Sequence, residues 1–406
     1  MDFAPDPRAA ALDTELAAFL TDRVLPAEPV LEAELAAVPD RWGPTPVVAR
    51  LQAEARERGL WNLFLPPNPL GAGAGLTNLQ YAPLAERSGR SPRLAPVAIN
   101  CAAPDTGNME LLVHYGTEAQ RERWLGPMLE GRRRSAFCMT EPDVASSDAT
   151  NIATRIRRDG DEYVIDGVKW WSTGAMDPDA TLLVVMGKTD PEAERHRQQS
   201  MLLVPRDTAG VTIVRPLTVF GYDDREHGGH AEIRFERARV PVDALLGGEG
   251  EGFAMAQARL GPGRIHHCMR AIGMAERALE LVRERVGGRY AFGSALSEQG
   301  VVRQWLAEAR IDLEAVRLLV LKTAWLMDTV GNRAARTEIQ AIKVAVPRVV
   351  QQVLDRAIQL FGGAGVSGDT PLAALFAAVR TLRIADGPDE VHLASLGRAE
   401  VRRPPA

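Results

Sequence analysis

Residues 134–246 carry the pattern of short β-strands, and this block lies between two regions with the pattern of helices. Its segments are rich in β-branched or aromatic residues and bounded by Gly, Asp or Pro: EYVIDGVKWWS, ATLLVVMGK, QSMLLVPRD and GVTIVRPLTVF. Short strands at this spacing are typical of a barrel or a sandwich. We therefore predict a middle domain over residues 134–246, built as an antiparallel β-barrel or sandwich.

Helical patterns occupy the chain on both sides of this block. Before it, apolar residues recur at three- and four-residue spacings in ALDTELAAFLTDRVL, PVVARLQAEARERGL, NMELLVHYG and EAQRERWLGPMLEG. After it, two apolar stripes run from Val302 to Met327 and from Ile339 to Leu360, and Pro347 inside the second predicts a kink or a restart. The predicted fold class is α+β multidomain, with an N-terminal helical domain (1–133) and a C-terminal antiparallel four-helix bundle (247–406).

Composition and charge exclude several classes of protein. The chain has 406 residues, of which 46% are hydrophobic and 25% charged, and its formal net charge of -5 gives no reason to expect a nucleic-acid partner. No uninterrupted apolar stretch is long enough to predict a membrane span, and the start MDFAPDPRAA lacks the order of a signal peptide. The 3 cysteines, at unrelated spacings, predict neither disulfides nor a zinc site. We expect a soluble, cytoplasmic protein.

The segment AFCMTEPDVASSDATN, residues 136–151, lies where the first helical region meets the β block. It combines the hydroxyls of Thr140, Ser146 and Ser147 with small residues, so that backbone N–H groups can approach a ligand closely. Hydroxyls and amides at this density can bind a polar heterocycle or a phosphate. From composition alone, a turn rich in Asp and Ser is the more common explanation.

The segment KWWSTGA, residues 169–175, ends a predicted strand with two adjacent tryptophans. In a regular strand these side chains point to opposite faces, so that one packs inside the domain and the other can cover a flat aromatic ligand. Thr173 then places a hydroxyl at the same edge. A tryptophan in the core remains the commoner interpretation.

Two glycine-rich breaks interrupt the C-terminal helices. QLFGGAGVSG (359–368) follows a predicted helix rather than a strand, which argues against a Rossmann dinucleotide loop. Two interpretations remain: a glycine-rich helix terminus, or a close approach of the backbone to a cofactor's phosphate or ribose. GRYAFGSALSEQ (288–299) places Arg289 between two helices, where either solvent or a phosphate would suit its charge.

The histidines do not predict a metal site. GYDDREHGGH (221–230) contains two histidines and three carboxylates, but His227 and His230 lie in a loop without zinc-site spacing. His266 and His267 are adjacent, so on a helix their side chains diverge. We therefore predict no metal.

The segment RIADGPDEVH, residues 383–392, brings the carboxylate of Asp386 out of an apolar stretch and breaks the backbone with Gly-Pro immediately afterwards. Such a carboxylate is either a solvated helix end or a general base at the edge of a dry pocket. Apolar Ile384 and Ala385 precede the acid, so we expect desolvation to raise the pKa of the base.

Singly these motifs are weak, but in their order, TEPDVASSDA, KWWST, RYAFG, QLFGGAG and a terminal carboxylate-Gly pair, the chain resembles the acyl-CoA dehydrogenase family over nearly its whole length. It is most similar to the subfamily whose animal members are fused to a kinase-like (aminoglycoside-phosphotransferase-like) domain; NCAAPDTGNMELL and RIADGPDEVH resemble its signatures. The chain has no room for that kinase domain.

The resemblance implies an FAD site between the β domain and the helical bundle. It assigns cofactor contacts to Phe137, Met139, Thr140, Ser146, Ser147, Trp171, Ser172 and Thr173, with Trp171 over the flavin and Thr173 near N5. It also places Ser146 and Ser147 along the substrate, and Arg264 and Gly387 beside the substrate.

The resemblance further implies that the cofactor site is shared between subunits of a homodimer or homotetramer. Residues that would reach the FAD of a neighbouring subunit are Arg289, Phe292, Gln359, Gly362 and Gly363. Pro388 and Glu390 also match cofactor positions, although Pro388 lacks the hydroxyl usually found there. The implied electron acceptor is an electron-transferring flavoprotein.

Asp386 matches the family's catalytic carboxylate, which is usually Glu. The implied reaction is α,β-dehydrogenation of an acyl-CoA thioester to 2-enoyl-CoA in fatty-acid β-oxidation or related catabolism: Asp386 removes the α-proton and the β-hydrogen leaves as hydride to flavin N5. Because Asp also serves as the base in nitroalkane oxidases, an enzyme of that kind or an acyl-CoA oxidase is the alternative within flavoenzymes. A non-catalytic helical binding or assembly protein is the alternative of another class.

Overall fold

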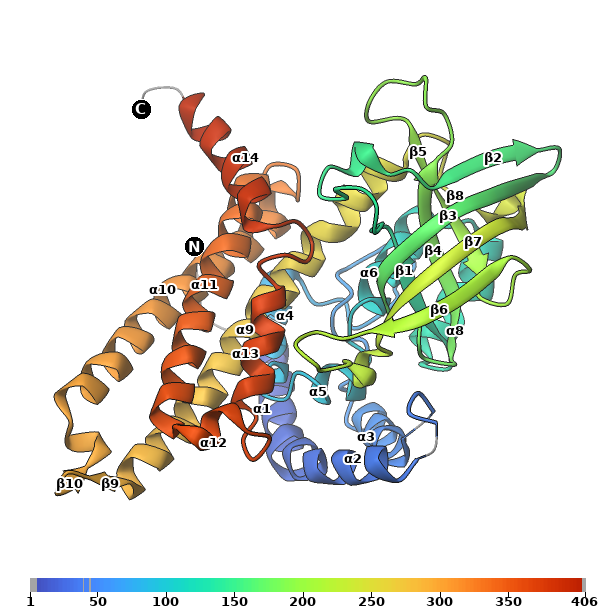
Figure 1. Cartoon of the computed structure of the whole chain (residues 1–406). Coiled ribbons are helices and arrows are strands. Elements are labelled where there is room, and N and C mark those ends of the chain that lie inside the picture. Colours follow the sequence, from blue (N-terminus) through green and yellow to red (C-terminus); the bar gives the residue numbers. More distant parts are fainter. Residues whose placement is uncertain (1–5, 39, 44, 404–406) are drawn as a thin grey trace. The chain divides into compact units, whose positions relative to one another are not determined.

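The strands predicted from residues 134–246 form one eight-stranded sheet. The computed structural model of the chain describes residues 6–38, 40–43 and 45–403, and within them the sheet has the order β6-β7-β3-β2-β4-β5-β8, with β1 paired to β4 (Figure 1). The strands are β1 (Arg134–Cys138), β2 (Arg155–Asp159), β3 (Glu162–Thr173), β4 (Ala180–Lys188), β5 (Gln199–Pro205), β6 (Val211–Leu217), β7 (His230–Pro241) and β8 (Leu245–Leu246).

The sheet is mixed rather than wholly antiparallel as predicted. β1 pairs with β4 in parallel, and β2 meets β4 in parallel through Arg155 and Lys188. The other neighbours in the sheet run antiparallel. The local apolar pattern gives the existence of a strand but not the direction of its partner, so these two pairs could not be read from the sequence.

Strands β4 and β5 are buried over nearly their whole length. Every residue of β5 except Pro205 is buried, and in β4 the six residues from Leu182 to Gly187 are buried without a break. A strand buried on both faces carries a continuous apolar run rather than an alternating one. This explains why ATLLVVMGK and QSMLLVPRD show no polar face.

The residues of the chain divide into two units, which we call the β unit and the helical unit. The β unit comprises residues 21–76 and 96–263, and the helical unit comprises the described residues within 1–20, 77–95 and 264–406. Helices of the β unit are α2 (Leu25–Ala37), α3 (Pro46–Glu57), α6 (Asp105–Tyr115), α7 (Glu118–Gln120) and α8 (Gly126–Leu129). Both α5 (Ala95–Ala98) and α9 (Gly252–Gly288) contribute residues to each unit.

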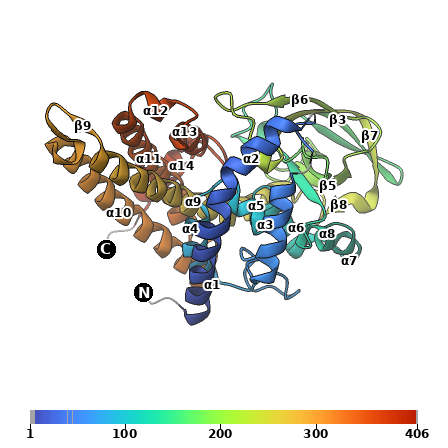
Figure 2. The same ribbon diagram turned by 90° about the horizontal axis from the view of Figure 1, so that it is seen from below.

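The helical unit is built around two long helices that match the predicted stripes. Its other elements are α1 (Pro7–Phe19), α4 (Asn78–Ser88), the hairpin β9 (Tyr290–Ala291) and β10 (Ser294–Ala295), α12 (Gly363–Val366), α13 (Leu372–Thr381) and α14 (Asp389–Val401). The long helices are α10 (Gly300–Val330) and α11 (Arg336–Phe361), and they pack against each other (Figures 1 and 2). Helix α11 runs through Pro347 without a restart.

The order of a helical region, a β region and a second helical region is confirmed. The boundaries predicted at 133/134 and 246/247 stay a prediction; the contacts group α1 and α4 with the C-terminal helices, because α1 packs on α4 and α4 packs on α10. Within the described part of the chain, no helix is both long enough and apolar enough to span a membrane.

Candidate active site

A β-bulge in β3 sets the position of the two tryptophans. On β3, Lys169 pairs with Ile233 of β7 and Ser172 pairs with Ala231, so Trp170 and Trp171 together oppose a single residue. Trp171 has the left-handed φ of 51°, and its side chain is exposed. The ring centres of the two tryptophans are only 6.2 Å apart. The prediction that they point to opposite faces is therefore wrong, because the bulge interrupts the alternation of the strand.

The bulge also ties β3 to the segment that follows β1. The backbone N–H of Trp170 donates to the carbonyl of Thr140 at 2.9 Å. Next to it, the ammonium of Lys169, which is fully buried, donates to the Met139 carbonyl at 2.9 Å and lies 2.7 Å from Oε1 of Glu141. Met139 and Thr140 are half-buried. Their backbone is thus fixed from the side of β3.

Glu141 holds the rest of this loop. Its carboxylate accepts the backbone N–H groups of Ala153 at 2.7 Å and Thr154 at 2.9 Å. Burial would raise the pKa of this carboxyl, but the charge of Lys169 and the hydrogen bonds from Lys169, Thr154 and Ala153 together outweigh burial and lower it. The hydroxyl of Ser146 accepts the backbone N–H of Glu141 at 2.9 Å, whereas Ser147 is exposed. The loop is therefore a fixed surface of backbone groups and hydroxyls.

Three further residues of the predicted cofactor set lie in the β unit. Phe137 is half-buried, with the guanidinium of Arg259 4.0 Å from its ring centre. Ser172 is fully buried and leaves no surface for a ligand. The hydroxyl of Thr173 lies 2.9 Å from Nδ1 of His230, and Nε2 of the same ring lies 2.9 Å from Oδ2 of Asp224.

These residues fit a flat, polar aromatic group such as a flavin. Trp171 has a partly exposed aromatic side chain, the half-buried Thr173 carries a hydroxyl two residues later, and the 139–147 loop contains backbone and hydroxyl groups. An aromatic ring covers such a ring system well, and hydroxyls fix its orientation.

Asp386 lies in the helical unit, in the turn between α13 and α14. Its φ is 56° and that of Gly387 is 99°, so two successive residues have left-handed backbone. The carbonyl of Asp386 accepts from Nε of Arg264 at 3.1 Å and lies 3.3 Å from Nε2 of His392. A Cβ on Gly387 would come within 2.9 Å of the His392 ring, so this position requires glycine.

The surroundings of Asp386 are basic rather than apolar. Nε2 of His267 lies 3.7 Å from its carboxylate, and Lys343, which is buried, donates to the Leu382 carbonyl nearby. Ile384 is 62% exposed and Ala385 is also exposed, so these two side chains do not desolvate the acid as predicted. The chain turns them outward because the left-handed turn follows directly.

His392 is kept uncharged beside this acid. Burial, together with the positive charges of Arg264 and Lys343, lowers the pKa of its imidazole to about 4. A neutral imidazole can still donate one N–H, and Nε2 faces the Asp386 carbonyl.

On α9, His266 is buried edge-on against Tyr81, with ring centres 4.9 Å apart. The predicted divergence of His266 and His267 is confirmed.

The start of α14 is fixed by a residue that the sequence did not single out. Asp389 is buried and accepts from Nε of Arg348 and from Nε of Arg383, each at 3.0 Å. Pro388 is the N-cap residue of α14, and Glu390 is exposed. The turn that carries Asp386 is thus anchored on its C-terminal side.

The remaining predicted cofactor residues lie at two exposed ends of the helical unit. Arg289 is exposed, and Phe292 is fully exposed with a φ of 54°. Phe292 and Gly293 form the two-residue turn of the β9–β10 hairpin. Gln359, Gly362 and Gly363 are exposed at the end of α11 and the start of α12.

Comparison with known families and proteins covers almost the whole chain. Three family domains match: Acyl-CoA dehydrogenase, N-terminal domain over residues 8–132, middle domain over 136–238 and C-terminal domain over 250–400. The chain is 56% identical over 404 residues to "Probable acyl-CoA dehydrogenase FadE2" of Mycobacterium tuberculosis, covering 99% of this chain and 98% of that protein. The chain belongs to the acyl-CoA dehydrogenase family.

Two further relatives of this acyl-CoA dehydrogenase-family chain bear on its extent and fold. The chain is 50% identical over 404 residues to acyl-CoA dehydrogenase family member 11 of Mus musculus. The aligned region covers 98% of this chain but 51% of that protein. The chain therefore spans about half the length of this animal relative. A Mycobacterium abscessus structure assigned to the acyl-CoA dehydrogenases superposes with a TM-score of 0.94 at 50% identity, covering 98% of this chain and 99% of that one.

Membership of the acyl-CoA dehydrogenase family makes the chain an enzyme of the flavoprotein oxidoreductase class, with acyl-CoA dehydrogenase activity implied by its relatives. In the described residues no group of three or more His, Cys, Asp and Glu side chains is arranged to hold a metal ion. Sequence reasoning missed four residues of the site: Asp224 and His230, weighed only as metal ligands, and Asp389 and His392. The last two lie one helical turn apart in DEVH, which was the available signal.

Proposed function

We propose that the chain catalyses the FAD-dependent α,β-dehydrogenation of acyl-CoA thioesters to 2-enoyl-CoA, in the catabolism of fatty acids or related acyl groups. Asp386 is the base that removes the α-proton. FAD, when bound, supplies the hydride acceptor for the β-hydrogen. The observation that carries this proposal is the left-handed backbone of Asp386, with its carbonyl anchored by Arg264 and close to His392.

Strained backbone at a non-glycine residue costs free energy of order 1–3 kcal/mol and persists where function requires it. Asp386 adopts this backbone and is followed by a glycine that no other residue could replace without a clash. An aspartate is one methylene shorter than a glutamate, so its reach depends more on where the main chain lies. Anchoring the Asp386 carbonyl therefore supports a carboxylate held at a fixed position.

The basic groups around Asp386 support two roles. The positive charges of Lys343 and Arg264 interact with the carboxylate of Asp386, and a carboxylate is the form that accepts a proton. The same carboxylate opposes the lowering of the Lys343 pKa that burial causes. Nε of Arg264 donates to the Asp386 carbonyl, which places the Arg264 guanidinium beside the proposed base. We assign substrate contacts to Arg264, to the Gly387 backbone, and to Ser146 and Ser147.

The proposed FAD residues of the β unit are Phe137, Met139, Thr140, Ser146, Ser147, Trp171 and Thr173. Ser172 is omitted because it is fully buried. In the helical unit, Pro388 and Glu390 remain assigned to the cofactor. Trp171 supports the aromatic part of the proposal, since a bulky residue that combines left-handed backbone with a 38% exposed side chain is uncommon and needs an explanation.

We further propose a homodimer or homotetramer in which Arg289, Phe292, Gln359, Gly362 and Gly363 of one subunit complete the cofactor site of another. The exposed Phe292 supports this, because a fully exposed aromatic side chain on strained backbone is costly in an isolated chain. An electron-transferring flavoprotein is the proposed acceptor. The cytoplasmic location stays a prediction.

The test is Asp386→Asn. Asn tolerates left-handed backbone, so the turn should be kept. We expect the variant to bind FAD with an unchanged visible spectrum but to lose anaerobic bleaching by acyl-CoA, with turnover reduced by about 10²–10⁴-fold, the range for removal of a general base. Glu400→Gln also replaces a carboxylate by an amide, at an exposed acid of α14. It should leave the visible spectrum, the bleaching by acyl-CoA and the turnover unchanged.

Full turnover in Asp386→Asn would exclude Asp386 as the base. The electron acceptor is checked on the wild-type enzyme, reduced anaerobically by acyl-CoA and then mixed with oxygen or with electron-transferring flavoprotein. Fast reoxidation by the flavoprotein and slow reoxidation by oxygen is expected of a dehydrogenase. The reverse order would favour the oxidase alternatives.

A further inference from the structure

Three side chains of the β unit form a continuous hydrogen-bonded series: Thr173, His230 and Asp224. β3 and β7 are neighbouring antiparallel strands (Figure 1), and Thr173 of β3 is paired with His230 of β7. Their side chains meet at 2.9 Å between Oγ1 and Nδ1, and Nε2 of His230 lies 2.9 Å from Oδ2 of Asp224. Both distances are normal for hydrogen bonds.

The series is held rigidly. His230 has a side-chain exposure of only 12%, and its ring stands edge-on to that of Trp171, with ring centres 5.4 Å apart. Asp224 has a φ of 48°, and its carbonyl accepts the backbone N–H groups of His227 and Gly229, both at 3.0 Å. The orientation of the imidazole is therefore set by the strand pairing, by a tryptophan and by a structured loop.

The same loop is fixed to the segment around Trp42 by residues on both sides of Asp224. Asp223 pairs with the guanidinium of Arg41, and Arg225 donates to the carbonyls of Arg41 and Gly43. A Cβ on Gly229 would overlap the ring of Trp42. These contacts use the neighbours of Asp224 for structure and leave its carboxylate directed at His230.

The proton positions follow from what each partner can donate. An ionised carboxylate only accepts, so Nε2 of His230 carries the hydrogen that Asp224 receives. In a neutral imidazole the other nitrogen is then an acceptor. The Thr173 hydroxyl must donate its only hydrogen to Nδ1, and its oxygen keeps lone pairs alone for any further partner.

We propose that the Asp224–His230 pair fixes the Thr173 hydroxyl as a hydrogen-bond acceptor toward the flavin, so that the site favours the reduced cofactor. This rests on the proposed FAD site. Reduced flavin has a hydrogen on N5 to donate, whereas oxidised flavin presents a lone pair at N5. A Thr173 oxygen that only accepts can bind the N5 hydrogen of reduced flavin. The same oxygen repels the N5 lone pair of oxidised flavin. Asp224 and His230 are positioning residues that act through Thr173.

The decisive variant is Asp224→Asn. Asn suits the left-handed backbone at this position, so the loop should be retained. Its amide can donate to Nε2, which moves the imidazole hydrogen to Nδ1 and turns the Thr173 hydroxyl outward as a donor. We expect the preference for reduced over oxidised FAD to fall at least tenfold, a decrease of about 30 mV in the two-electron midpoint potential.

Asp207→Asn is the matched control, because it makes the same change in the β unit at an exposed acid outside the loop that holds Asp224. It should leave the potential within a few millivolts of the wild type. The potential is measured by equilibration with reference dyes in the absence of acyl-CoA, so it does not depend on Asp386 or on turnover. A lack of dehydrogenase activity would therefore leave the expected change in potential intact, and an unchanged potential would leave the dehydrogenase activity intact.

Two further measurements show whether the effect passes through Thr173. In a Thr173→Val background the change caused by Asp224→Asn should disappear, as a double-mutant cycle requires of coupled groups. Nitrogen-15 spectra of histidine-labelled protein without flavin should show His230 with its hydrogen on Nε2 in the wild type and on Nδ1 in Asp224→Asn. An unchanged potential in Asp224→Asn, a change that persists without the Thr173 hydroxyl, or a wild-type His230 protonated on Nδ1 would each overturn the proposal.

Discussion

At the scale of single residues, the position of Asp386 was readable from RIADGP but its surroundings were not. The Gly-Pro break marked a carboxylate at the end of an apolar stretch. The groups that surround it, Arg264, His267 and Lys343, come from α9 and α11, and the sequence spacing between them carries no sign of proximity. The same limit applies to the tryptophans of KWWST, since a bulge depends on the pairing of β3 with a distant strand.

Gly387 offers a test of whether the turn geometry matters for catalysis. Replacing it by Ala forces a side chain onto a backbone with φ of 99° and toward the His392 ring at 2.9 Å. We expect Gly387→Ala to lose about 1–3 kcal/mol of stability and, because Asp386 moves, to reduce anaerobic bleaching while FAD is retained. Gly368→Ala, where a Cβ would meet nothing within 4 Å, should be neutral in both assays. Wild-type bleaching rates in Gly387→Ala would show that the anchored turn is dispensable.

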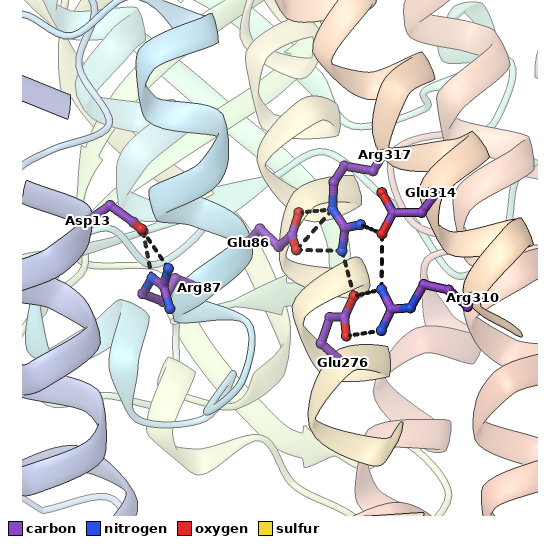
Figure 3. Close-up of polar contacts among 7 residues, drawn as sticks. All are labelled: Asp13, Glu86, Arg87, Glu276, Arg310, Glu314 and Arg317. Atoms are coloured by element: carbon purple, nitrogen blue, oxygen red, sulfur yellow. Dashed lines mark hydrogen bonds and ion pairs between the residues drawn. The ribbon is translucent and has the colours of Figure 1, made fainter. Parts of the chain in front are cut away.

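At the scale of elements, helices were predicted well because their signal is local. Seven of the stripe residues of α10 are buried: Val302, Ala309, Leu313, Val316, Val320, Ala324 and Met327. What the stripes could not show is which helices pack together. Arg317 of α10 pairs with Glu86 of α4 and with Glu276 of α9 (Figure 3), and Arg87 of α4 pairs with Asp13 of α1. These ion pairs link α1 and α4 to helices that lie far from them in the sequence.

The carboxylate of Glu276 on α9 makes this cluster sensitive to acid. Burial alone would raise its pKa, but hydrogen bonds and charges from Arg310 and Arg317 outweigh burial and bring the pKa to about 2 (Figure 3). Relative to an ordinary value of 4.5, this corresponds to about 3 kcal/mol at roughly 1.4 kcal/mol per pKa unit. Because the pKa is depressed in the folded state, this stabilisation is present above about pH 4.5 and is lost as the pH falls toward about 2.

We therefore expect Glu276→Gln to lower the thermal midpoint at pH 7 by roughly 6–12 °C, the change that about 3 kcal/mol produces in a unit of this size. The difference from the wild type should shrink as the pH is lowered below about 4.5. Glu314→Gln, at a carboxylate 50% exposed in the same cluster, should have a smaller effect. A difference between wild type and Glu276→Gln that stays constant down to pH 3 would contradict the assignment.

At the scale of the whole molecule, the chain exposes features that are costly unless another subunit covers them. The β9–β10 hairpin has positive φ at both turn residues, Phe292 and Gly293, as a type I′ turn requires. Asn-Gly is the preferred pair for this turn, so phenylalanine is a poor choice for the hairpin alone. Its full exposure supports the proposed contact of Phe292 with the cofactor site of a neighbouring subunit.

Phe292→Asn separates these roles in one substitution. It supplies the preferred turn residue, so the fold and thermal midpoint of the isolated chain should be unchanged or slightly improved. If Phe292 completes the cofactor site of a neighbouring subunit, the variant should dissociate more readily on dilution and lose FAD with dissociation. Light scattering over a dilution series measures dissociation. The flavin absorbance per chain over the same series measures the loss of FAD. Val401→Ser on α14, which removes an 88% exposed apolar side chain outside the proposed contact, is the control. A wild-type monomer that keeps all its FAD and bleaches with acyl-CoA would show that one chain completes the site by itself.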